Sequence, residues 1–247
     1  MTPRLPALKP ARPETVALAA FVATLIDLAA AGLLLLAFVD HYAPPQDLPW
    51  KPLSLDHPLG MATGAKINRI ADDPAACRAV LAEGGVRFSE VAPRTDGFCS
   101  TVNAVRLEGG TTPLAPAGPT MTCPEALAVS LWDRQVLQPA ARTVLKSRIV
   151  AIDHYGTYSC RRIYGRTTGR VSEHASANAF DFAGVRLADG RRITVARHFR
   201  AKDARGDFMR QIRDGACRVF RATLSPDYNA AHHDHLHLDS GRFQLCR

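Results

Sequence analysis

The longest apolar stretch of the chain lies near its N-terminus. Residues 16–39 carry a single charged side chain, Asp27. As a helix they would be about 36 Å long, which exceeds the roughly 30 Å hydrocarbon core of a bilayer. Asp27 costs about 2.5–3.5 kcal/mol on insertion, and about thirteen Leu, Ile, Val and Phe residues outweigh it at roughly 0.3–0.6 kcal/mol each. The pattern predicts a transmembrane helix over residues 16–39.

The flanking sequence predicts the orientation and fate of this helix. It is preceded by three basic residues, Arg4, Lys9 and Arg12. Under the positive-inside rule, residues 1–15 are then a cytoplasmic tail, and everything after Asp40 lies outside. The alternative is a cleaved signal peptide, but the apolar run is long for one and ends without a small-x-small cleavage site. The pattern favours an uncleaved, single-pass anchor.

The pattern changes twice after this helix. Residues 40–66 contain five prolines between Ala43 and Gly60, which predicts an extended linker. From residue 67 to residue 247, short apolar runs separated by turn residues predict one globular domain.

Within this domain, the spacing of apolar residues predicts both helices and strands. Helices are predicted over Pro74–Glu83, Pro124–Lys146 and Asp203–Leu224, with an interruption of the second helix at Pro139. Strands are predicted over Val86–Val91, Val102–Leu107, Ile149–Tyr155, Phe180–Leu187, Arg192–Ala196 and His235–Asp239. The fourth and fifth strands form a hairpin around Asp189-Gly190. Because the order shows no βαβ rhythm, the predicted class is α+β, with a small antiparallel sheet flanked by helices.

Composition narrows the class of protein. Of the 247 residues, 47% are hydrophobic and 22% charged, which excludes a mostly disordered chain. The concentration of apolar residues in one segment excludes a polytopic membrane protein. The formal net charge of +8 is compatible with nucleic acid, an anionic membrane surface or an acidic polymer as partner. Export and the lack of a nucleic-acid-binding motif argue against nucleic acid.

The cysteines agree with export. All six follow the apolar stretch, at positions 77, 99, 123, 160, 217 and 246, and none forms a C-x-x-C pair. An even number of cysteines outside the cytoplasm predicts up to three disulfides, with buried free thiols as the alternative. Six cysteines allow 15 pairings, so the connectivity stays open.

Two segments concentrate residues that bind metals. The first runs from Ser172 to Asp181 and contains His174, and the second runs from His232 to Asp239. If the second segment is a strand, its alternation places Leu236 and Leu238 toward the core and three histidines on the opposite face: His233, His235 and His237. Two His and one Asp would supply three zinc ligands and leave the fourth position open, as in catalytic zinc sites.

These segments resemble the signature of a peptidase superfamily. Ser172-Glu173-His174 with Asp181, followed by the late His235-Leu236-His237, is similar to the pattern of the D-Ala-D-Ala metallopeptidase and lysostaphin superfamily. Within it, the resemblance is closest to the extensin-like C-terminal domain of bacterial envelope proteins and extends from about Cys77 to Arg247. It includes Ser159-Cys160-Arg161 and Tyr228-Asn229.

The resemblance implies roles for single residues. It implies Zn²⁺ as cofactor, with His174, Asp181 and His237 as ligands. His235 would be the catalytic base, Asp234 competes for that role, and His232 matches an additional active-site histidine. Ala177 departs from the family, which usually has Gly there, and Asn178 is then expected to take up the unusual backbone angle.

Charged neighbours suggest how a substrate would be held. Peptides of the bacterial wall carry free carboxylates, which an arginine binds well. The nearest candidates are Arg161, Arg162 and Arg170, and Ser172 and Glu173 are expected to orient the ligands or line the site.

The predicted function is that of a membrane-anchored zinc peptidase. It would lie in a bacterial inner membrane with its C-terminal domain in the periplasm, and would hydrolyse amide bonds in the stem peptides or cross-links of peptidoglycan. Two alternatives stay open: a non-catalytic scaffold that binds peptidoglycan, and a metallohydrolase for another envelope amide. The sequence does not specify a protein partner.

Overall fold

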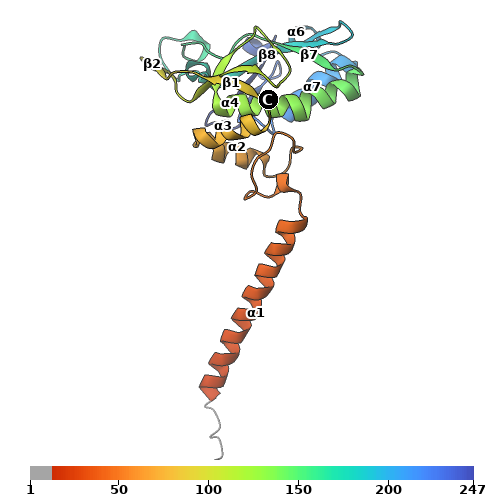
Figure 1. Cartoon of the computed structure of the whole chain (residues 1–247). Helices are drawn as coiled ribbons and strands as arrows, with labels where there is room; N and C mark the ends of the chain where they lie inside the picture. Colours follow the sequence, from red (N-terminus) through yellow and green to blue (C-terminus); the bar gives the residue numbers. More distant parts are fainter. Residues whose placement is uncertain (1–12) are drawn as a thin grey trace, which may run out of the picture. The chain divides into compact units, whose positions relative to one another are not determined.

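A computed structural model describes residues 13–247, which divide into two units, up to Pro44 and from Pro45 onward (Figure 1). Most of the predicted cytoplasmic tail, residues 1–15, lies outside the described residues. The first unit contains α1 (Pro13–Tyr42). Within α1, residues Val16–Tyr42 are long and apolar enough to cross a membrane, a criterion that a signal sequence also meets.

The second unit is built on a mixed sheet. Its strand order is β12-β10-β11-β8-β7-β5, and β9 pairs with β8. The strands are β5 (Leu114–Ala115), β7 (Ile149–His154), β8 (Ala179–Leu187), β9 (Arg192–Thr194), β10 (Ala222–Leu224), β11 (Leu236–Asp239) and β12 (Leu245–Cys246). The pairs β5–β7 and β10–β12 are parallel and the others antiparallel. The predicted α+β class and the hairpin around Asp189-Gly190 are confirmed.

Two smaller sheets and the short helices complete this unit. One sheet joins β1 (Arg87–Glu90), β4 (Ala104–Gly109) and β6 (Thr120–Thr122), and a hairpin joins β2 (Arg94–Asp96) to β3 (Cys99–Thr101). The remaining short helices are η1 (Pro45–Asp47), α2 (Thr63–Ala71), α3 (Pro74–Glu83), η4 (Ile163–Gly165), η5 (Glu173–Ser176), α6 (Val195–His198) and η6 (Ala230–His232). The bounds of α3 agree with the prediction, because Pro74 and Gly84-Gly85 mark its ends.

The central helical segment packs on the core face of the sheet. It consists of α4 (Cys123–Trp132), the π-helical η2 (Asp133–Leu137), α5 (Gln138–Ala140) and the π-helical η3 (Ala141–Leu145). The ring of Trp132 on α4 lies edge-on to Phe182 of β8, with centroids 5.1 Å apart. Its Nε1 donates to the carbonyl of Ile212 at 3.0 Å. The interruption predicted at Pro139, which lacks an N–H, takes the form of the two flanking π-helical turns.

The third predicted helix is shorter than its pattern suggested. It is α7 (Ala204–Ala216), and the prediction that it continues to Leu224 is wrong. Residues Ala222–Leu224 form β10, which pairs with β11 and β12. Backbone hydrogen bonds to two strands outweigh the helical period of the side chains, and Val219 and Phe220 are buried in the turn between the elements.

The segment predicted as an extended linker belongs largely to the compact unit. From Pro45 onward it folds against the domain, and Leu48, Leu53 and Leu55 are buried. The ammonium of Lys66 donates to the carbonyl of Pro45 at 2.6 Å. The linker prediction for residues 45–66 is therefore wrong, because leucines between the prolines supply apolar surface for the core.

All six cysteines form disulfides. The pairs are Cys77–Cys123, Cys99–Cys160 and Cys217–Cys246. The predicted count of three is confirmed, and no free cysteine is found among the described residues. The second bridge joins β3 to the segment that precedes η4, and the third joins the end of α7 to β12.

Candidate metal centre

Two of the predicted ligands face each other across a strand pair. The antiparallel pairing of β8 and β11 places Asp181 directly opposite His237. Their neighbours Phe180, Phe182, Leu236 and Leu238 are fully buried in the core. Because side chains alternate along a strand, Asp181 and His237 lie on the opposite face of the sheet. Oδ1 of Asp181 is 3.0 Å from Nδ1 of His237.

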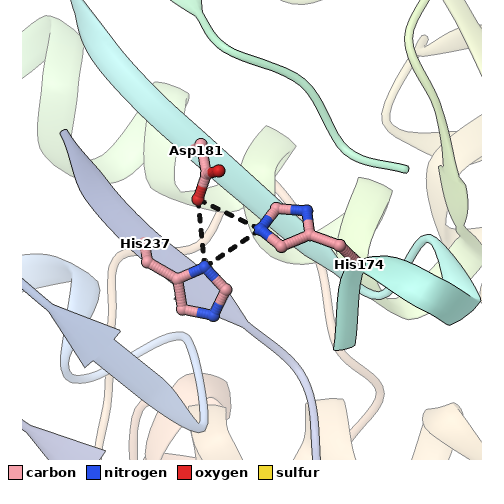
Figure 2. Close-up of side chains that lie close together, drawn as sticks. All are labelled: His174, Asp181 and His237. Carbon is pink, nitrogen blue, oxygen red and sulfur yellow. Dashed lines mark hydrogen bonds and ion pairs between the residues drawn. The ribbon is translucent and has the colours of Figure 1, made fainter. Parts of the chain in front are cut away.

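The third predicted ligand comes from a loop. His174 lies in the 3₁₀ helix η5, where the Ser172 hydroxyl accepts a hydrogen bond from its backbone N–H at 3.3 Å. Its Nε2 is 3.2 Å from Oδ1 of Asp181 and 3.1 Å from Nδ1 of His237. Figure 2 shows the three side chains converging from the loop and the two strands.

The end of this loop corrects one expectation. Ala177, and not Asn178, adopts the left-handed conformation, with φ of 56°. The left-handed conformation costs an alanine about 1–2 kcal/mol, whereas a glycine adopts it freely. The loop nevertheless closes, since the N–H of Ala177 donates to the carbonyl of His174 at 3.2 Å. The alanine therefore occupies the conformation that a glycine would supply.

Outer contacts fix which ring atoms face the centre. Nδ1 of His174 donates to the carbonyl of Thr157 at 3.2 Å, and Nε2 of His237 donates to the Asp239 carboxylate at 3.2 Å. Nε2 of His174 and Nδ1 of His237 are thereby left as the atoms that point toward Asp181. The three ligand atoms lie within 4.8 Å of one another. Two imidazole nitrogens and a carboxylate oxygen, oriented in this way, form a donor set that suits zinc and other divalent transition metals.

Electrostatics at the centre favour a cation. Burial would raise the pKa of Asp181, but hydrogen bonds from His174 and His237 hold it well below its usual value. Burial would lower the pKa of His237, but its hydrogen bonds to Asp181 and Asp239 raise it to about 9. The lowered pKa of Asp181 and the raised pKa of His237 both indicate that the Asp181 and Asp239 carboxylates stabilise positive charge between the strands.

His235 and Asp234 form a pair beside the centre. Nδ1 of His235 donates to Oδ1 of Asp234 at 2.9 Å. Nε2 of His235 is then directed toward the centre, 3.6 Å from Oδ1 of Asp181. His235 is one of the residues that line the adjacent cavity. Asp234 thus fixes the orientation of the His235 ring relative to Asp181.

His232 is buried next to these histidines. Its ring centroid lies 5.2 Å from that of His235 and 5.8 Å from that of His237. Its Nδ1 donates to the side-chain oxygen of Asn229 at 2.8 Å. Burial, followed by repulsion from His237 and His235, lowers its pKa to about 4. At neutral pH it is therefore an uncharged imidazole.

His233 does not share the face of the other histidines. The strand begins at Leu236, and residues before it belong to the turn after η6, so the alternation does not reach His233. Its side chain is 73% exposed, and its Nδ1 donates to the carbonyl of Ala230 at 2.9 Å. The prediction that it joins His235 and His237 on one face is wrong.

A cavity of about 360 Å³ opens beside the centre. Its lining includes Asp181, His232, His235 and His237, and also three predicted substrate-binding residues, Arg161, Arg170 and Ser172. The guanidinium of Arg162 lies instead over the Phe98 ring, 4.7 Å from its centroid. Arg162 is thus held away from the cavity.

Several residues that shape the site were not predicted from the sequence. Asp239, two positions after His237 on the same face of β11, could have been found from the strand alternation. Phe243 and Leu245 line the cavity from the C-terminal segment, and the Thr157 contact is made by a backbone carbonyl. Every residue type has a backbone carbonyl, so the identity of residue 157 does not predict this contact.

Comparisons with known proteins give one match. A family model described as the C-terminus of extensin-like proteins matches residues 75–247. No curated protein and no solved structure matches the chain. The predicted extent of the resemblance, from about Cys77 to Arg247, agrees with the matched residues.

Proposed function

The chain belongs to the extensin-like C-terminal family, and we propose that it is a membrane-anchored periplasmic zinc metallopeptidase acting on peptidoglycan. It would hydrolyse amide bonds in stem peptides or cross-links. The observation that carries the proposal is the convergence of His174, Asp181 and His237, with both outer ring nitrogens held by acceptors. The resemblance to the D-Ala-D-Ala metallopeptidase and lysostaphin superfamily belongs to this proposal.

The three converging residues would hold the metal. With zinc held there, His174, Asp181 and His237 would present a Lewis acid, which would activate water and polarise a scissile carbonyl. Asp239 and the Thr157 carbonyl keep both imidazoles oriented for that task.

His235 is the proposed base. Its Nε2 accepts a proton from the attacking water and returns it to the nitrogen of the leaving amine. In the neutral ring of His235, the bond from Nδ1 to Asp234 places the proton on Nδ1 and leaves Nε2 as the acceptor, and the same carboxylate would stabilise the imidazolium that forms. His232, which is neutral and buried against both His235 and His237, presents its Nε2 as an acceptor for a substrate N–H.

The cavity supports a carboxylate-bearing substrate. Arg161 and Arg170 line it, and the Arg170 guanidinium lies 3.7 Å from the centroid of the Phe243 ring, which fixes its position. Stem peptides offer free carboxylates that such guanidinium groups bind with charge-assisted hydrogen bonds. The net charge of +8 suits a protein that faces an anionic wall.

The alternatives are a scaffold that binds peptidoglycan without turnover and a hydrolase for another envelope amide. The scaffold alternative is based on Ala177, which stands where the family usually has Gly. Because Ala177 adopts the left-handed angle, the loop that carries His174 keeps its closure. This observation favours the peptidase over the scaffold.

The test is digestion of purified sacculi by the full chain in detergent, loaded with zinc, with mass analysis of released muropeptides. The parent protein is expected to release fragments, and His174→Ala and His237→Ala are expected to release none and to bind no zinc. Variants that digest sacculi as well as the parent would refute the peptidase. Binding of sacculi by the zinc-loaded parent without release would favour the scaffold.

A further inference from the structure

Thr122, at the N-terminus of α4, is bonded to the loop that carries His174. Its hydroxyl donates to Oδ1 of Asn178 at 2.7 Å and accepts from the N–H of Glu125 at 3.3 Å. Its own N–H donates to the carbonyl of Ala177 at 2.9 Å. The start of α4 is thereby fixed to the end of the loop.

Asn178 extends this connection in two directions. Its Nδ2 donates to the Glu173 carboxylate at 3.1 Å, across the loop that contains His174. Its backbone carbonyl accepts from the N–H of Ser240 at 3.2 Å, just after β11. One side chain and its backbone therefore link the loop of one ligand to the strand of another.

Glu125 reaches the same strand from the first turn of α4. It is fully buried, and its Oε2 accepts from the Ser240 hydroxyl at 2.6 Å. Its Oε1 has no hydrogen-bond partner among the described residues. Ser240 follows Asp239, whose carboxylate holds His237. Burying a carboxyl group is costly, and packing alone would be served better by an apolar residue.

We propose that Asn178 and Glu125 are positioning residues of the metal centre. Asn178 fixes the loop of His174 to Thr122 at the N-terminus of α4, and Glu125, in the first turn of α4, fixes the end of β11 through Ser240. Together they set the distance between the two imidazoles that face Asp181. The inference rests on the metal centre of the proposed function, but not on hydrolysis.

The expected effect is a loss of metal affinity without a loss of fold. Removing the Asn178 side chain breaks its hydrogen bonds to the Thr122 hydroxyl and the Glu173 carboxylate, so the loop of His174 is held less tightly. Outer contacts of metal ligands typically contribute 10- to 100-fold in affinity. Neither Asn178 nor Glu125 is a member of the three disulfides or of the apolar core around Trp132.

The experiment is a titration of the full chain in detergent with Co²⁺, whose visible absorption reports coordination geometry. Asn178→Ala and Glu125→Ala are expected to weaken Co²⁺ binding about 10- to 100-fold and to change the spectrum. Glu125→Gln keeps an acceptor for the Ser240 hydroxyl and is expected to show the Co²⁺ affinity and the spectrum of the parent. The matched control is Ser130→Ala, which removes a buried hydroxyl on α4 that donates, within the part of the chain that the structure describes, to the carbonyl of Ala126.

The outcomes separate this inference from the proposed function. Affinities and spectra of Asn178→Ala and Glu125→Ala equal to those of Ser130→Ala would overturn it. Ser240→Ala, which removes a single hydroxyl, gives the same comparison if Glu125→Ala does not fold. A parent chain that binds no Co²⁺ would overturn the inference and the metal centre together. A parent chain that binds Co²⁺ but releases no muropeptides would overturn the peptidase alone.

Discussion

His237 lies directly opposite Asp181 in the β8–β11 pair, with Nδ1 of the imidazole 3.0 Å from Oδ1 of the carboxylate. Because the register is fixed by leucines and phenylalanines on the other face, neither side chain can leave the centre without disturbing the core. The pair is therefore a rigid half of the centre, to which His174 is added from a loop.

This rigidity predicts the effect of Asp181→Asn. The amide keeps the shape of the side chain but removes the negative charge, so zinc affinity is expected to fall at least about tenfold while the strand register is retained. Competition with a chelator measures the affinity. Asp153→Asn is the control, because Asp153 is a buried carboxylate on the neighbouring strand that pairs with Arg186 and Arg192. Equal zinc affinities for the two variants would contradict the ligand role.

Replacement of His235 separates proton transfer from metal binding. His235→Ala is expected to lower the turnover of sacculi by about 10²- to 10⁴-fold and to leave zinc content unchanged. Asp234→Asn should cause a smaller loss, because the ring keeps a hydrogen-bond partner. His233→Ala, on an exposed side chain, should match the parent. Full activity in His235→Ala would exclude it as the base.

The arginines of the cavity predict a carboxylate requirement. Arg170→Ala is expected to lower kcat/KM for a stem peptide by about 10- to 100-fold, since a charge-assisted hydrogen bond contributes about 1.5–3 kcal/mol. Arg162→Ala should have no effect, because its guanidinium lies over Phe98. Amidation of the peptide carboxylates should remove the difference between Arg170→Ala and the parent. A difference that persists with the amidated peptide would count against this contact.

Glu125 predicts a pH dependence of stability. Burial raises the pKa of Glu125 well above its usual value, against the smaller effect of the Ser240 hydrogen bond. Its stabilising contribution is therefore complete below the unfolded-state pKa of about 4.3 and is lost as pH rises toward the folded-state pKa. Glu125→Gln has no such proton, so its free energy of unfolding relative to the parent should increase with pH. The slope is at most about 1.4 kcal/mol per pH unit.

Urea unfolding of the parent and Glu125→Gln between pH 5 and pH 8 measures this difference. The free energy of unfolding of Ser130→Ala should differ from that of the parent by a constant amount across this pH range, because the substitution removes no titrating group. A constant difference between Glu125→Gln and the parent across the range would show that Glu125 is not held as a neutral acid.

The Cys217–Cys246 bridge predicts a loss of stability. It joins residues 29 apart and holds β12 beside β10. Replacing both cysteines with serine is expected to lower the free energy of unfolding by about 3–4 kcal/mol. Urea unfolding of the double variant and of the parent measures the loss, and a difference below about 1 kcal/mol would contradict it.

Local signals in the sequence were sufficient for several elements. Pro74 and Gly84-Gly85 define α3, Asp189-Gly190 defines the hairpin, and the alternation of Leu236 and Leu238 defines the facing of β11. In each case the residues that decide the structure are neighbours along the chain.

Elements that depend on distant partners were not predictable in this way. Residues 222–224 read as helix because their strand partners lie elsewhere in the sequence. Leu53 and Leu55 are buried against core residues that lie mostly after residue 66, so their burial cannot be predicted from residues 45–66 alone. The disulfide pairing stayed open for the same reason.

The candidate site shows the same division. His174, Asp181 and His237 were identified from their motif, and the structure brings them together. Glu125 was not, because it lies 115 residues from Ser240 and belongs to a helix whose sequence reads as ordinary core.

The register of β11 has a consequence for the order of biosynthesis. His174 and His237 are 63 residues apart, and β11 finds its place only between β8 and β10. A nascent chain that has emerged only as far as β8 can offer His174 and Asp181, but not the third side chain. The triad is therefore completed late, when the last strands of the domain have emerged and paired.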